Sequence, residues 1–150
     1  MLANGCSLGK VLVMNPAFWV FLVCMLGVCS YAVLRGGRDE RIGAIALAVA
    51  AVISPLAMSQ NWGGPEVGVV IVDIALLAAL VALAMKSRAF WPIWAAGFQA
   101  CAVSVHFVAA KMPTMLPIVY ADALALWAYP VLTALAIGTL LEARGSHERS

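Results

Sequence analysis

The sequence predicts an all-α membrane protein, a bundle of five transmembrane helices with the N-terminus outside and the C-terminus in the cytoplasm. Hydrophobic residues make up 65% of the chain and charged residues 11%, and the mean hydropathy is +1.01, far above that of soluble domains. The apolar residues gather in long runs separated by short polar connections. Because each crossing takes about 20 residues, a chain of 150 residues has room for one such bundle and no second domain.

Five apolar runs are long enough to cross a hydrocarbon core of about 30 Å. They cover residues 17–34, 42–59, 66–85, 89–110 and 118–141. The connections RGGRDER, SQNWGGPE, KSR and KMPTMLP follow the first four runs, and their shortness favours sequential antiparallel neighbours. We therefore expect a transmembrane domain at 14–142, after an extension at 1–13 that is disordered or non-native and before a cytoplasmic tail at 143–150.

The first run has an alternative interpretation as a cleaved signal peptide, with Lys10 as its charged region and SYA, ending at Ala32, as its cleavage site. Cleavage would leave four helices and would place RGGRDER outside the membrane, against the charge bias described below. We therefore keep the first run as a helix. Met14, which precedes NPAFW, is an alternative start of the chain.

Small residues recur at four-residue spacing in the second and fifth runs, as in Ala44 with Ala48 and Ala134 with Gly138. This spacing lets helix backbones approach closely. It predicts either packing inside the bundle or a contact with another chain. The expected partners are the lipid bilayer and, as an open possibility, a second copy or another membrane subunit.

Basic residues are distributed unequally between the two sides of the predicted membrane. Seven fall on one side and two on the other: Arg35, Arg38, Arg41, Lys86, Arg88, Arg144 and Arg149 against Lys10 and Lys111. The positive-inside rule then gives the stated orientation. The first five can also contact anionic lipid headgroups. A net charge of +2 without a contiguous basic patch argues against nucleic-acid binding.

Aromatic residues fall at several of the predicted boundaries, as is typical of membrane interfaces. The residues concerned are Phe18, Trp19 and Trp62 at the outer boundary and Phe90, Trp91 and Trp94 at the inner one.

The third run, VGVVIVDIALLAAL at 67–80, contains one carboxylate, Asp73. A charge near the centre of a membrane helix costs about 2.5–3.5 kcal/mol, so we expect Asp73 to have a structural or functional role. At 1.5 Å per residue, Asp73 lies about 10 Å from the outer end of its helix, His106 about 8 Å and Asp122 about 6 Å. Three ionisable groups from three helices therefore share one depth.

A spacing of seven residues, nearly two helical turns, adds a further polar residue to the same face of each of these helices. The result is a candidate intramembrane polar cluster: Asp73, His106, Asp122, Gln99, Tyr129 and Glu66. We predict that Asp73, His106 and Asp122 form an ionisable layer open to the outside. Gln99 and Tyr129 then form a deeper neutral layer.

The cluster allows two functional interpretations. Polar side chains inside membranes often only bond one helix to another, which favours a non-enzymatic accessory or structural protein. The alternative is a small proton- or cation-handling carrier or channel that uses Asp73, His106 and Asp122.

An enzyme is the least favoured class. The chain contains no H-E-x-x-H, no G-x-S-x-G and no glycine-rich phosphate loop, so no catalytic motif supports it. The four cysteines include no C-x-x-C pair, which argues against zinc and against a disulfide framework. We expect no catalytic residue, no metal and no cofactor.

The strings RGGRDERIG, GPEVGVVIVD and SRAFWPIWAAGFQ, followed by His106, resemble a group of uncharacterised small multi-span inner-membrane proteins of Alphaproteobacteria. The likeness covers most of the chain from Met14 onward. The resemblance implies a bacterial inner-membrane location, and it assigns no activity to any residue.

Overall fold

The computed structural model describes residues 16–57, 67–112 and 117–148. In these ranges the chain forms five α-helices and no strand. They are α2 (Pro16–Arg35), α3 (Arg38–Leu56), α4 (Val67–Lys86), α5 (Trp91–Lys111) and α6 (Pro117–Glu148). The prediction of an all-helical bundle is confirmed.

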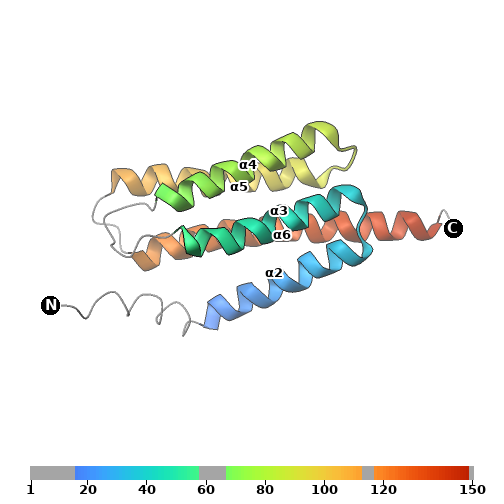
Figure 1. The fold of residues 1–150 in the computed structure, drawn as a ribbon, viewed down its shortest axis with the longest axis horizontal. Coiled ribbons are helices and arrows are strands. Elements are labelled where there is room, and N and C mark those ends of the chain that lie inside the picture. The colour runs from blue at the N-terminus through green and yellow to red at the C-terminus, as the bar shows by residue number, and fades with distance from the viewer. Residues whose placement is uncertain (1–15, 58–66, 113–116, 149–150) are drawn as a thin grey trace.

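The helices lie side by side along one long axis, and α6 extends beyond the others at its C-terminal end (Figure 1). Each helix packs against the next one along the chain, as the short connections predict. The ring is closed by α6 against α2, and α3 contacts α6 across it. We call the end that carries Arg35, Arg38, Arg41, Lys86 and Arg88 the basic end of the bundle; all five side chains are exposed there.

The turn between α2 and α3 is made by two glycines at the basic end. Gly36 has no room for a side chain, because a Cβ there would overlap the Ala32 carbonyl oxygen and the Glu40 Cβ. Gly37 caps α3, and Asp39 and Glu40 occupy its first turn, where carboxylates interact favourably with the helix dipole. This explains why α3 begins at Arg38, earlier than the apolar run at 42 predicts.

The inner face of α5 follows a seven-residue repeat that places polar side chains in the core. Ala95, Ala102 and Ala109 alternate with Gln99 and His106, and all five are buried. The three alanines let α4 and α6 each pack closely against α5, because small residues bring helix backbones together. The two polar residues are thereby enclosed between helices.

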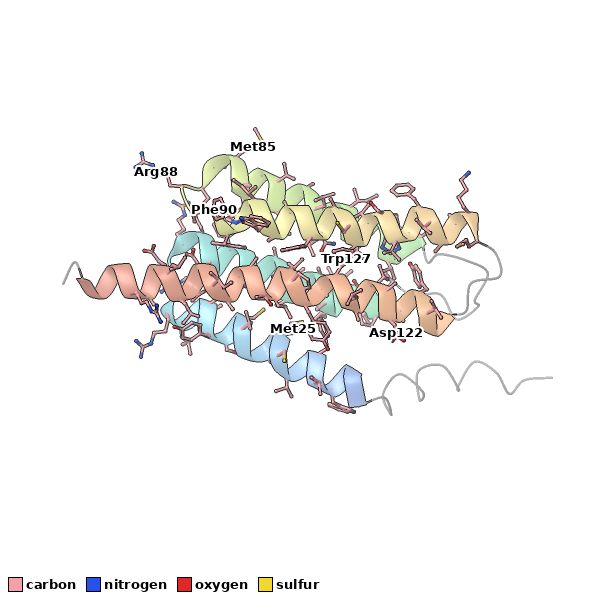
Figure 2. All side chains as sticks on the ribbon, turned by 180° about the vertical axis from the view of Figure 1, so that it is seen from behind. Met25, Met85, Arg88, Phe90, Asp122 and Trp127 are labelled. Atoms are coloured by element: carbon pink, nitrogen blue, oxygen red, sulfur yellow. The ribbon has the colours of Figure 1, made fainter. Side chains whose placement is uncertain are left out.

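The rest of the core is apolar, and so is the outer surface of the bundle. Leu76, Leu80 and Leu83 of α4 pack with Val131 and Leu135 of α6 in the core. Large apolar side chains also point outward from every helix; Met85, for example, is 83% exposed and projects from α4 in Figure 2. Such a surface is stable in contact with lipid tails and not with water.

Within the residues that the structure describes, three helices are long and apolar enough to span a membrane, against five predicted. These are α4, α5 and the part of α6 from Val119 to Gly145. In α2 the stretch whose side chains the structure describes, Trp19–Arg35, is apolar but shorter. In α3 the four charged residues at 38–41 occupy the first turn, so the apolar part of the helix is shorter than the helix itself.

The last helix continues to Glu148, whereas the sequence predicts that it ends at 141 and is followed by a tail. Glu142, Ala143 and Arg144 are good helix formers, so the helix does not need lipid contact to extend through them. The predicted extension at 1–13 lies outside the described residues.

Candidate functional site

The side chain of Asp73, on α4, contacts His106 on α5. The distance between Asp73 Oδ2 and His106 Nε2 is 2.6 Å. The His106 side chain is 1% exposed and that of Asp73 is 17% exposed. The pair is therefore almost completely enclosed.

The other ring nitrogen of His106 contacts a residue of α6. His106 Nδ1 lies 2.5 Å from the hydroxyl oxygen of Tyr120, and the two rings meet edge to face with centroids 5.5 Å apart. Tyr120 is 5% exposed. His106 therefore joins α4 to α6 through its two nitrogens.

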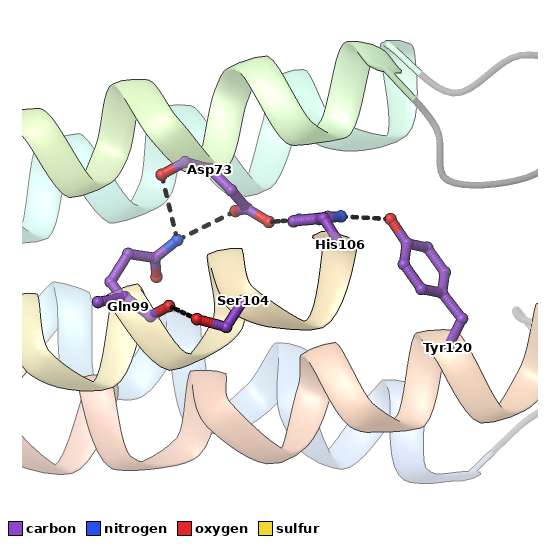
Figure 3. Close-up of polar contacts among 6 residues, drawn as sticks. Asp73, Gln99, Ser104, His106 and Tyr120 are labelled. Carbon is purple, nitrogen blue, oxygen red and sulfur yellow. Dashed lines mark hydrogen bonds and ion pairs between the residues drawn. The ribbon is translucent and has the colours of Figure 1, made fainter. Parts of the chain in front are cut away.

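Gln99 extends the contact toward the middle of the bundle. Its Nε2 donates to Asp73 Oδ1 at 3.2 Å and lies 3.4 Å from the Asp73 backbone oxygen. Both carboxylate oxygens of Asp73 thus have a partner. We call Asp73, Gln99, His106 and Tyr120 the polar chain; it connects α4, α5 and α6 (Figure 3).

The hydrogen bonds of the polar chain can form in more than one protonation state of the Asp73–His106 pair. With neutral His106, Nε2–H donates to the Asp73 carboxylate and Nδ1 accepts from the Tyr120 hydroxyl; with the imidazolium, both nitrogens donate. The imidazolium–carboxylate pair has no net charge, and neither has neutral imidazole beside a protonated carboxyl. Because a net charge is expensive inside a membrane, these two neutral arrangements suit the location.

Two of the residues predicted to join the cluster do not reach it. Asp122 is exposed, and Tyr129 packs edge to face on Phe21 of α2, with ring centroids 5.6 Å apart. Neither reaches the polar chain, because Tyr120 is the residue of α6 that faces His106. At 100° per residue, position 122 lies about 200° and position 129 about 180° around the helix from Tyr120. The seven-residue spacing placed Asp122 and Tyr129 on one face correctly, but it is the face on the α2 side.

Of the remaining predicted members, Gln99, Asp73 and His106 come together, and Glu66 lies outside the described residues. Gln99 bonds directly to Asp73, so the two predicted layers are in contact. The Asp73–His106 pair is enclosed, with side chains 17% and 1% exposed, and is not open to the outside as predicted.

Tyr120 is the member of the polar chain that sequence reasoning missed. A signal was present in the connection KMPTMLP, which is short enough to bring the end of α5 and the start of α6 together. His106 lies five residues before Lys111, the end of α5, and Tyr120 three residues after Pro117, the start of α6. The two side chains are thus at similar depths.

A second buried polar contact, also missed, lies at the basic end. Trp91 Nε1 donates to Glu40 Oε1 at 2.9 Å, and the two residues are 4% and 3% exposed. The indole is enclosed by Gly43 of α3 and Gly138 of α6, where a Cβ atom would overlap the ring. We call Glu40, Gly43, Trp91 and Gly138 the tryptophan joint.

The tryptophan joint turns Trp91 into the bundle, although the sequence places it at the same predicted boundary as Phe90 and Trp94. Trp91 is a core residue, whereas its neighbours Phe90 and Trp94 are 68% and 52% exposed, as interfacial residues are.

Close by, Ser87 Oγ donates to Asp39 Oδ2 at 2.5 Å and accepts from the Ala89 backbone N–H at 2.9 Å. The segment between α4 and α5 is thereby attached to the start of α3.

Among the described residues, no group of three or more histidine, cysteine or carboxylate side chains could hold a metal ion. The chain matches no known protein family, no curated protein and no solved structure. The chemistry of the polar chain is therefore inferred from its own residues.

Proposed function

We propose that this protein is a non-enzymatic integral membrane protein with an accessory or structural role, in which the polar chain holds α4, α5 and α6 in register. One observation supports this most directly: every hydrogen-bonding atom of the two central side chains of the polar chain has a partner. Both nitrogens of His106 and both carboxylate oxygens of Asp73 are in contact with other residues of the polar chain. Bonds between membrane helices stabilise their association by about 0.6 kcal/mol on average and up to about 1.7 kcal/mol.

We also propose that all five helices cross the membrane, with the basic end in the cytoplasm. In support, α2 and α3 pack into the same bundle as the three long apolar helices, and helices that share a bundle share its environment. The exposed arginines and lysines at the basic end agree with the positive-inside rule. The bacterial inner membrane is our proposal for the location, and it rests only on the sequence resemblance described above.

The stabilising role is tested by replacing Asp73 and His106 by alanine, singly and together, and measuring the free energy of unfolding in detergent. We expect a coupling energy of about 1–2 kcal/mol, because either single change leaves the other partner buried without its bond. Asp122→Ala is the matched control and should change stability by less than about 0.5 kcal/mol, as expected of an exposed residue. Additive effects at 73 and 106 would contradict the proposal.

The same contacts support a second candidate, proton handling. The specific observation is the 2.6 Å contact between Asp73 Oδ2 and His106 Nε2, across which a proton can pass from one residue to the other without a change of net charge. Proton flux into proteoliposomes under an imposed pH gradient separates the candidates. The structural role predicts flux equal to that of empty liposomes for the wild type and for Asp73→Asn. Flux in the wild type that Asp73→Asn abolishes would favour proton handling.

A further inference from the structure

A cavity of about 730 Å³ lies between α5 and α6 near the basic end, away from the polar chain. One wall is formed by aromatic residues of α5 and the other by apolar residues of α6, including Ile137 and Leu141. Its volume falls within the range of about 300–1,000 Å³ that is typical of small-molecule sites.

The aromatic wall is a continuous stripe. Phe90, Trp94 and Phe98 follow one another at four-residue spacing, with centroids 5.8 Å apart for the first pair and 6.2 Å for the second. Such rings offer apolar area, and their faces attract cations.

The charge of the lining is one-sided. Glu40 lines the cavity, as does Glu142, which has a contact of its own, and the described lining contains no lysine or arginine. Glu40 is 3% exposed and accepts the Trp91 indole N–H through Oε1. No ion pair to Glu40 occurs in the part of the chain that the structure describes. The helix dipole and one hydrogen bond compensate this buried carboxylate only in part, so a bound cation would lower the free energy of the site.

We propose that this cavity binds a lipophilic organic cation, an amine or onium group on an apolar or aromatic body. The body lies against Phe90, Trp94 and Phe98, and the charge lies toward Glu40. An uncharged occupant such as a lipid acyl chain would fill the apolar part and leave the carboxylate without a counter-charge. The site is separate from the polar chain and does not depend on its role.

The experiment compares two probes of the same shape and opposite charge. Tetraphenylphosphonium and tetraphenylborate are titrated into the purified full-length protein in detergent, with empty micelles as the blank, by isothermal calorimetry. We expect the cation to bind at least about tenfold more tightly than the anion, a difference of ~1.4 kcal/mol. Equal affinities would show an apolar groove without charge selection and would overturn the proposal.

Two variants locate the site. Glu40→Gln keeps an oxygen that accepts the Trp91 N–H and removes the charge, so the cation should bind about tenfold more weakly. Ile137→Trp fills the cavity from an exposed position and should abolish binding while Glu40 stays intact. Asp122→Asn, an exposed carboxylate that does not line the cavity, is the control and should leave Kd unchanged.

Retained wild-type affinity in both folded variants would overturn the proposal. If Glu40→Gln does not fold, Ile137→Trp and the comparison of the two probes decide the question.

Discussion

The two ends of the bundle are held together in different ways. At one end, the polar chain connects three helices through hydrogen bonds between buried side chains. At the basic end, a single indole is enclosed between two glycine surfaces and makes one hydrogen bond to a buried carboxylate. The polar chain is held by hydrogen bonds between side chains, and the tryptophan joint is held mainly by close packing of the indole against the two glycines.

This difference has an energetic consequence. A hydrogen bond between membrane helices contributes about 0.6 kcal/mol on average, while overpacking a close contact costs about 1–3 kcal/mol. The tryptophan joint should therefore be the more sensitive of the two to a small change. The following predictions test this order, beginning with the largest effect.

The largest effect is expected at Gly138, where a Cβ would overlap Trp91 Cβ, Cγ and Cδ1. These atoms are near the backbone of α5 and cannot move aside, so Gly138→Ala should lower the free energy of unfolding by about 3 kcal/mol. The control is Gly97→Ala on α5, where a Cβ meets nothing within 4 Å. That change should be neutral or should stabilise the helix by up to about 1 kcal/mol. Denaturation in detergent measures both, and similar stabilities for the two variants would show that Trp91 is not enclosed in this way.

A smaller loss is expected when the indole N–H is removed. Trp91→Phe takes the donor from Glu40 Oε1 and leaves a buried carboxylate oxygen unsatisfied, which should cost about 2 kcal/mol. Trp94→Phe is the matched control, because Trp94 is 52% exposed, and its cost should stay below about 0.5 kcal/mol. Thermal unfolding followed by circular dichroism distinguishes them. An unchanged Tm for Trp91→Phe would mean that the bond to Glu40 does not stabilise the fold.

The smallest loss is expected at Tyr120. Tyr120→Phe removes the hydroxyl that contacts His106 Nδ1 and should cost about 1 kcal/mol, within the range for bonds between membrane helices. Tyr129→Phe removes a hydroxyl from the face that packs on Phe21 and should cost less than about 0.5 kcal/mol. The comparison uses the free energy of unfolding and a second readout, the ¹⁵N shifts of the His106 ring. Only Tyr120→Phe should move the Nδ1 signal, and a shift with Tyr129→Phe instead would favour the cluster predicted from the sequence.

Much of the polar chain could be predicted from the sequence, because depth along a helix follows from counting residues at a constant rise. Asp73 and His106 were placed at one level in this way, and Gln99 on the same face as His106, and the structure brings all three together. Counting also placed Asp122 at that level. It does not give the rotation of α6 relative to α5, and that rotation puts Tyr120 inside and Asp122 outside.

The tryptophan joint could not be predicted by the same reasoning. RGGRDER is typical of a solvated, topology-setting connection, and Trp91 falls where an interfacial aromatic residue is expected. Glu40 is buried because α3 begins early, at Arg38, and turns that carboxylate toward Trp91. Gly43 and Gly138 contribute by lacking side chains, which leaves room for the Trp91 ring. The sequence does not show which residue fills the space beside a glycine.

By itself, the sequence determined that this chain forms apolar helices in a fixed order, and at which levels its polar residues lie. These properties depend on hydropathy, helical rise and connection length, all of which are local. The tertiary structure alone decided which faces meet, because the rotation of each helix about its axis is set by contacts with helices distant along the chain. That rotation selected Tyr120 over Asp122, enclosed Trp91 between two glycines, and placed a carboxylate at the edge of an aromatic cavity.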